Sequence, residues 1–271
     1  MKIKAKSKLE EHILSHLTPE GGFLDLEDKN VTPEHLRLLC QAGETLQKVK
    51  QLDLSNNGLG DAEIEFLSKS RCLPKLEKLF LNHNKISDSG AKILAESKLV
   101  QNISCLMLEA NQIGVNGAQS LATSLNLKNL ETLFLDSNPI GPEGAEALAR
   151  STCLPSLTAL HMDSTGIGDQ GVKAIAASQT LSKIKKLYLC SNKIGDEGAI
   201  ALSQSPNLSH LTCLSIWRNE IRDAGGKAIA ESNHFLKLER LYMSLNLIEK
   251  PTRKLIRASD MASRLKTLVM D

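Results

Sequence analysis

Residues 187–198 read Leu187-Tyr-Leu-Cys-Ser-Asn192-Lys-Ile194-Gly-Asp-Glu-Gly198, and variants of this stretch recur along most of the chain. In each variant two apolar residues alternate with other residues, an asparagine follows shortly after (a threonine, Thr165, in one variant), and an isoleucine or leucine comes two positions later. The first leucine stands at positions 52, 79, 106, 133, 160, 187, 214, 241 and 268, which is a step of 27 residues each time. A fixed period of this size is typical of a solenoid built from stacked copies of one unit.

Each unit predicts a short strand followed by a tight turn. The two apolar residues point into the core and the residues between them point out, as in a parallel strand. An asparagine side chain after the strand can bond backbone groups of its own turn and of neighbouring turns. We expect these asparagines to form a structural ladder, which Thr165 interrupts: Asn57, Asn84, Asn111, Asn138, Asn192, Asn219 and Asn246.

The second half of each unit predicts a helix. A glycine, an alanine and further apolar residues recur at helical spacing, as in Gly90-Ala-Lys-Ile-Leu94-Ala-Glu-Ser97. Asp61, Asp88, Asp169, Asp196 and Asp223 stand where these helices should begin. Because a helix is about 10 Å wide and strands lie about 4.8 Å apart, the stack must curve. The sequence therefore predicts an α/β fold, a right-handed solenoid or horseshoe with parallel strands on the concave face and helices on the convex face.

The strand, the asparagine, the Ile-Gly-Asp-x-Gly pattern and the helix resemble the ribonuclease-inhibitor-like class of leucine-rich repeat proteins. The resemblance covers residues 24–271. Members of this class include the ribonuclease inhibitor, sensing domains of innate immune receptors, a GTPase-activating protein and bacterial effectors. The uniform step of 27 differs from the two alternating repeat lengths of the ribonuclease inhibitor. The resemblance implies a surface that binds proteins.

Three regions are predicted along the chain. Residues 1–51 should hold an N-terminal capping helix at 8–17 and a degenerate first repeat that begins at Leu24. Residues 52–248 should hold eight complete 27-residue repeats, and residues 249–271 a C-terminal helix and a final strand.

Composition excludes several classes of function. The net charge of +2 gives no bulk reason to expect nucleic acid or an anionic membrane as partner. No apolar run approaches the roughly 18 residues of a membrane span, and the charged start of the chain lacks the apolar stretch of a secretory signal. Six cysteines without paired spacing suit a reducing compartment. We predict a cytoplasmic protein without cofactor or metal site.

The candidate binding residues lie between and just after the buried strand leucines, where side chains should face out of the concave sheet. Five of the eight aromatic residues fall in these positions, and exposed rings commonly anchor partners. An acidic line accompanies them, suited to a basic group or cation, or simply solvated. The predicted partner-binding residues are Phe80, Met107, Phe134, His161, Tyr188, Trp217, Arg218 and Tyr242, with Glu109, Asp136 and Asp163 as the acidic line. The cluster Tyr188, Trp217, Arg218 and Tyr242 is the preferred anchor; the alternative is that the rings only stack across strands.

Catalysis is the competing interpretation. Cys190, His161 and Asp163 fall on adjacent strands, in the combination that cysteine hydrolases use. The diagonal offset should keep His161 roughly 7–8 Å from Cys190, beyond hydrogen-bond reach, and an open sheet offers no oxyanion loop. We therefore predict no enzyme.

The predicted function is a protein–protein interaction module that binds a partner protein through its concave face. The alternative is an effector that an intracellular bacterium delivers into the host cytosol, where it binds a host protein. The chain is expected to be a monomer, with a dimer through the C-terminal edge strand as the alternative.

Overall fold

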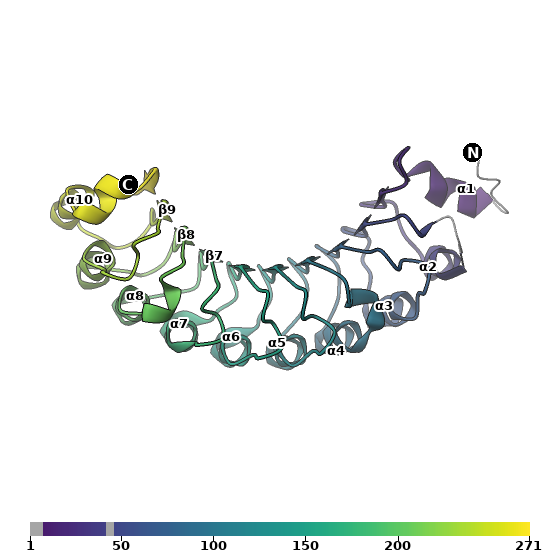
Figure 1. The fold of residues 1–271 in the computed structure, drawn as a ribbon, viewed down its shortest axis with the longest axis horizontal. Coiled ribbons are helices and arrows are strands. Elements are labelled where there is room, and N and C mark those ends of the chain that lie inside the picture. The colour runs from purple at the N-terminus through teal and green to yellow at the C-terminus, as the bar shows by residue number, and fades with distance from the viewer. Residues whose placement is uncertain (1–7, 42–45) are drawn as a thin grey trace.

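The computed structural model describes residues 8–41 and 46–271, which form one curved solenoid (Figure 1). Ten parallel strands line the inner side of the arc in a single sheet whose strand order follows the chain, and the helices lie along the outer side. The predicted α/β solenoid is confirmed. Residues 1–7, which the sequence predicts not to be a secretory signal, lie outside the described residues.

The strands are three residues long and alternate with helices. The strands are β1 (Phe23–Asp25), β2 (Gln51–Asp53), β3 (Lys78–Phe80), β4 (Cys105–Met107), β5 (Thr132–Phe134), β6 (Ala159–His161), β7 (Lys186–Tyr188), β8 (Cys213–Ser215), β9 (Arg240–Tyr242) and β10 (Thr267–Val269). The helices are α1 (Lys8–Ser15), α2 (Pro33–Gln41), α3 (Asp61–Ser68), α4 (Asp88–Glu96), α5 (Val115–Ala122), α6 (Gly141–Ala149), α7 (Gly168–Ala177), α8 (Asp196–Ser203), α9 (Asp223–Ala230), α10 (Lys250–Arg257) and α11 (Asp260–Arg264). No helix of the described part is both long and apolar enough to cross a bilayer.

The 27-residue step sets the register of the sheet. Leu160 pairs with Leu187, and Leu187 pairs with Leu214, so that the same position of each unit stacks on itself. These leucines are completely buried, together with the second strand leucines and the isoleucines after the turn, such as Leu189 and Ile194. Burial of this continuous apolar row between sheet and helices is the main stabilising contribution.

The buried asparagines bond both ways along the solenoid. The Asn84 amide nitrogen donates to the carbonyls of Leu54 and Leu81, and its oxygen accepts the backbone N–H groups of Asn57 and Leu59. At the Thr165 position, the hydroxyl still donates to the carbonyl of Met162. An asparagine at position 165 would accept a hydrogen bond from the Ile140 N–H. This N–H instead donates to the carbonyl of Asn138 in its own loop. Thr165 therefore keeps the ladder bond within its own turn, but it replaces neither the bond that an asparagine donates to the preceding unit nor the bonds that it accepts from that unit.

The aspartates at the helix starts form a second ladder. Each lies in the first turn of its own helix, yet its carboxylate accepts N–H groups from the start of the next helix. Asp169 of α7 accepts from Gly195 and Gly198 at the start of α8. A Cβ on Gly198 would lie 2.5 Å from Oδ1 of Asp169, so glycine is required at this close approach. The carboxylate thereby caps a helix that begins 27 residues later.

Helices α6 and α7 lack this cap and start differently. Val115 and Pro142 occupy the positions from which aspartates would cap α6 and α7. Both helices begin one residue earlier than their neighbours, at Gly141 and Gly168, whose φ angles are 63° and 55°. Glycine adopts this left-handed conformation without steric cost.

A serine ladder closes the C-terminal ends of the helices. The Ser97 hydroxyl donates to the carbonyl of Ser68, and Ser178 donates to the carbonyl of Ala149. The same bond joins each of the intervening and following units, from Ser124, Ser151, Ser205 and Ser232. Helix ends leave carbonyls without intrahelical partners, and these hydroxyls satisfy one per unit.

Replacement of Asp169 by alanine should lower the free energy of unfolding by about 1–2 kcal/mol, because two N–H groups at the start of α8 lose their acceptor. Asp169→Asn retains an acceptor oxygen and should lose less than half as much. Urea denaturation of both variants measures the difference. Equal losses for the two substitutions would contradict a capping role.

Candidate functional site

Two rows of side chains stand on the concave sheet. One row is the last residue of each strand, and the register places Phe134 beside His161 and His161 beside Tyr188. The other row lies two residues further on and includes Glu109, Asp136 and Asp163. These rows hold most of the residues predicted from the sequence to bind a partner.

Three rings form a continuous stack across β5, β6 and β7. The ring centroids of Phe134 and His161 are 3.8 Å apart at an interplanar angle of 26°, and those of His161 and Tyr188 are 4.1 Å apart at 14°. All three side chains are half-buried, so the stack keeps part of its surface exposed to solvent. Fixed rings of this kind present apolar area whose rotamers are already restricted before a partner arrives.

The stack is uncharged at neutral pH. Burial, and next to it the charge of Lys186, lowers the pKa of His161 to about 4. Burial raises the pKa of Tyr188 to about 12, and the Tyr188 hydroxyl accepts a hydrogen bond at 3.7 Å from the Cys213 thiol on β8. The imidazole is therefore a flat, uncharged ring between the two larger rings.

The remaining apolar residues flank the stack. Phe80 and Met107 occupy the same row on β3 and β4, and the register pairs them with each other and Met107 with Phe134. Tyr242 occupies the row on β9, separated from Tyr188 by Ser215, which is buried. The row thus runs from β3 to β9 with one small residue in it.

The preferred anchor cluster is not assembled as one group. Tyr188 stacks on His161, and no ring contact joins it to Trp217 or Tyr242 among the described residues. Arg218 lies on the loop after β8 with a φ of 56° and lines a shallow cavity of about 470 Å³ with Ser164, Ser191 and Lys193. Arg218 therefore lies at the rim of the sheet, and the rings of the row that contact one another are Phe134, His161 and Tyr188.

The acidic line is tied to the backbone. Oδ1 of Asp136 accepts the N–H of Asp163, and Oδ1 of Asp163 accepts the N–H of Cys190, both at 2.6 Å. The N–H of Glu109 donates in the same way to Oδ1 of Asn82. The side chains of Asn82, Asp136 and Asp163 therefore each accept an N–H of the next unit, a structural task that the sequence prediction did not include.

Burial weakens the negative charge of this line. Burial raises the pKa of Asp136 to about 7, and the neighbouring negative charges of Asp163 and Glu109 also raise it. The hydrogen bond from the Asp163 N–H acts in the opposite direction and lowers this pKa. Burial also raises the pKa of Asp163. Asp136 is therefore only partly ionised near neutral pH, and a cation beside it would favour its ionised form.

Asp136 and His161 should contribute opposite pH dependences to stability. Between pH 3.8 and about 7, folded Asp136 holds a proton that the unfolded chain has lost, so stability falls as pH rises. Between about pH 4 and 6.5, folded His161 lacks a proton that the unfolded chain binds, so stability rises with pH. In the wild-type protein the two effects should largely cancel over this window.

In the Asp136→Asn variant, only the effect of His161 remains, so the free energy of unfolding should rise from pH 4 to 6.5. In the His161→Phe variant, only the effect of Asp136 remains, so the free energy of unfolding should fall over the same range. Chemical denaturation at a series of pH values measures both slopes. Slopes of the same sign in the two variants would contradict these assignments.

The hydrolase alternative lacks its activated nucleophile. Burial raises the pKa of the Cys190 thiol to about 11, and the sulfur lies 3.0 Å from the Ser215 hydroxyl. His161 is held between two rings, and within the described residues no hydrogen bond joins its imidazole to Cys190. A protonated thiol beside an unprotonated, separated imidazole does not match the thiolate–imidazolium pair of cysteine hydrolases.

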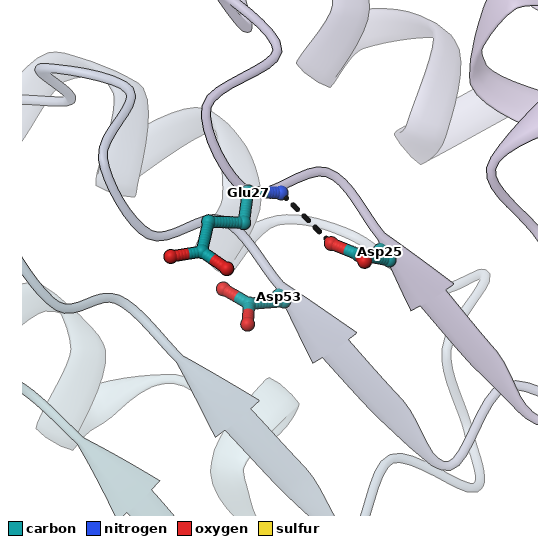
Figure 2. Close-up of side chains that lie close together, drawn as sticks. All are labelled: Asp25, Glu27 and Asp53. Carbon is teal, nitrogen blue, oxygen red and sulfur yellow. Dashed lines mark hydrogen bonds between the residues drawn. The ribbon is translucent and has the colours of Figure 1, made fainter.

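One group of acidic residues was not singled out from the sequence. Asp25, Glu27 and Asp53 lie at the N-terminal end of the concave sheet, and each offers an oxygen within 4.8 Å of the others (Figure 2). The chain itself supplies hydrogen bonds to all three: Asp25 accepts the Glu27 N–H, Asp53 accepts the Ser55 N–H, and Glu27 accepts from the amide of Asn56. Carboxylate oxygens are ligands for hard cations, but these bonds already account for the arrangement. Its signal in the sequence is the run of acidic residues at successive row positions.

Comparisons with known proteins identify the repeated unit. A family model described as "Leucine Rich repeats (2 copies)" matches residues 47–92. A second, described as "Leucine Rich repeat", matches residues 126–149, 153–176, 180–203 and 207–230, so that the two models together match more than half of the chain. A comparison with curated proteins found no match.

Proposed function

The chain belongs to the leucine-rich repeat proteins, and we propose that it binds a partner protein through the concave face of its sheet. Leucine-rich repeats are generally protein-interaction modules and are typically non-catalytic. The partner's contact surface would be centred on β4 to β7, where the ring stack and the acidic line run side by side. The protein would act by presenting a preformed surface, without a chemical step.

The observation that carries this proposal is the ring stack of Phe134, His161 and Tyr188. The strand leucines already fill the core, so the three rings are not needed to bury the sheet. Half-exposed rings at a concave surface reduce solubility, and such patches commonly mark interaction sites. The hydrogen-bonded strands hold the rings in place, so that docking orders few side chains.

The acidic line supports a partner with a basic group next to its apolar contact. Oδ1 of Asp136 and Oδ1 of Asp163 each accept a backbone N–H, and Asp163 also forms a side-chain hydrogen bond with Cys190, but carboxylate oxygens can each accept more than one donor. Both residues are only half-buried, so these oxygens remain within reach of a donor. Paired carboxylates on adjacent strands, roughly 5 Å apart, suit a guanidinium or ammonium group.

Affinity capture tests the proposal. The wild-type protein, a concave variant carrying Phe134→Ala and Tyr188→Ala, and a control carrying Leu125→Ser on the convex side would each serve as bait. A protein held by the wild type and by the control but not by the concave variant is the expected result. Retention of every captured protein by the concave variant would refute the proposed surface.

A further inference from the structure

A second exposed apolar group lies at the rim of the sheet, after β9. Leu245 and Leu247 flank the ladder residue Asn246, and their exposed fractions are 54% and 48%. Trp217, in the adjacent unit, is 38% exposed. The N–H of Arg218 bonds the carbonyl of Ser244, and the N–H of Leu247 bonds that of Ile221, so the two loops lie side by side.

Leucine is unusual at both rim positions of this repeat. The residues equivalent to Leu245 in the preceding units are small or polar: Asn56, His83, Ala110, Ser137, Ser164, Ser191 and Arg218. All of these positions are left-handed, and Leu245 has a φ of 53°. A bulky side chain is unfavourable in this conformation, whereas asparagine tolerates it. Leu245 therefore adds strain without burying its side chain, which points to a role outside the folding of the chain.

Positive charge is concentrated next to these leucines. Residues 249–271 contain six basic and three acidic residues, a net charge of +3 in a chain whose total is +2. Helix α10 buries Ile256 and Thr252, while Lys250 and Lys254 are exposed and Arg253 is half-buried. None of these three cations forms a salt bridge with a described residue. A salt bridge in the same segment joins Lys266 to Glu239.

Asp271 connects the leucines to the basic helix. Its carboxylate accepts the N–H of Leu245 at 2.7 Å. That bond, and beyond it the charges of Arg253 and Arg257, lower the pKa of Asp271. The guanidinium of Arg257 donates to the carbonyl of Met270 at 2.6 Å. The exposed leucines and the arginines of α10 therefore belong to one continuous surface.

We propose that this C-terminal rim patch, formed by Trp217, Leu245 and Leu247 with Lys250, Arg253 and Lys254, docks an acidic segment of a partner protein that carries apolar side chains between its carboxylates. The apolar side chains would cover the leucines and Trp217, and the carboxylates would pair with the cations of α10. This docking surface is separate from the ring stack, so the two can fail or hold independently. Its ionic part should weaken as salt is added.

The single tryptophan of the chain makes the patch directly observable. The probe is a synthetic peptide in which leucines alternate with pairs of glutamates, and the readout is Trp217 fluorescence on titration. Saturable binding is expected, with at least tenfold weaker affinity for the Leu245→Ser/Leu247→Ser variant and several-fold weaker affinity between 50 and 300 mM salt. The matched control is Leu125→Ser/Leu236→Ser, which removes leucines that are 82% and 66% exposed elsewhere and should bind as the wild type does.

A further variant separates docking from folding. Leu245→Asn should raise the melting temperature slightly, because asparagine suits the left-handed position, and should still weaken peptide binding. Equal affinity for the rim variant and the wild type, or equal loss in the control, would overturn the proposal. So would tighter binding to a peptide with lysines in place of glutamates, preference for phosphatidylserine vesicles over the acidic peptide, or self-association that the rim variant abolishes.

Discussion

Replacement of Asn192 by alanine is expected to lower the free energy of unfolding by about 3–5 kcal/mol, one of the largest effects of any polar substitution in the chain. The Asn192 oxygen accepts the N–H groups of Thr165, Gly166 and Ile167 and the hydroxyl of Thr165. Its amide nitrogen donates to the carbonyls of Met162 and Cys190. Asn192 is 1% exposed, so water cannot replace these partners without opening the core.

Urea denaturation measures this loss, and Asn233→Ala is its control. Asn233 is exposed and its side chain makes no hydrogen bond with any residue that the structure describes, so its replacement should change stability by less than about 0.5 kcal/mol. A loss below about 1 kcal/mol for Asn192→Ala would show that the ladder contributes little to the stability of the solenoid.

The second large effect concerns binding of the captured partner. Phe134→Ala and Tyr188→Ala should each weaken affinity at least tenfold, and the double variant about a hundredfold or more, since central aromatic residues dominate interface energies. The losses should not be additive, because both rings contact His161 and either truncation frees one face of the imidazole. Calorimetry of the purified pair measures all three values.

Unfolding measurements on the same variants show whether a loss of affinity comes from a lost binding contact or from a disrupted fold. The rings lie outside the leucine core, so each single variant should retain the cooperative unfolding of the wild type. The Leu125→Ser control should bind normally. If the partner bound both single variants with wild-type affinity, the ring stack would not contribute to binding.

The fold was predictable because its cause is repeated along the chain. Leu160, Leu187 and Leu214 stand 27 residues apart, and a one-residue slip of a strand would turn its apolar side chains toward water. The hydrogen bonds of the aspartate ladder were harder to predict from the sequence. An aspartate at a helix start normally predicts a cap on its own helix, whereas Asp169 caps the next one. The signal is present in the sequence as a glycine 29 residues later, but it becomes interpretable only when the spacing between helices is known.

The surface was less predictable than the core. Position in the repeat was enough to place Phe134, His161 and Tyr188 on the sheet, but not to decide which rings would touch. Tyr188 stacks on His161 and its hydroxyl accepts a hydrogen bond from Cys213, and no ring contact between Tyr188 and Trp217 occurs within the described part of the chain. Asp136 and Asp163 illustrate a further limit, because their burial and their bonds to the backbone depend on neighbours that are 27 residues away in sequence.

Hydroxyl-radical footprinting of the protein with its captured partner tests the concave-face claim most directly. Oxidation of Met107, Phe134 and Tyr188 should fall on binding, while oxidation of Leu125 and Leu236 should not change. Protection confined to these two leucines, with Met107, Phe134 and Tyr188 oxidised as in the free protein, would contradict binding through the concave sheet.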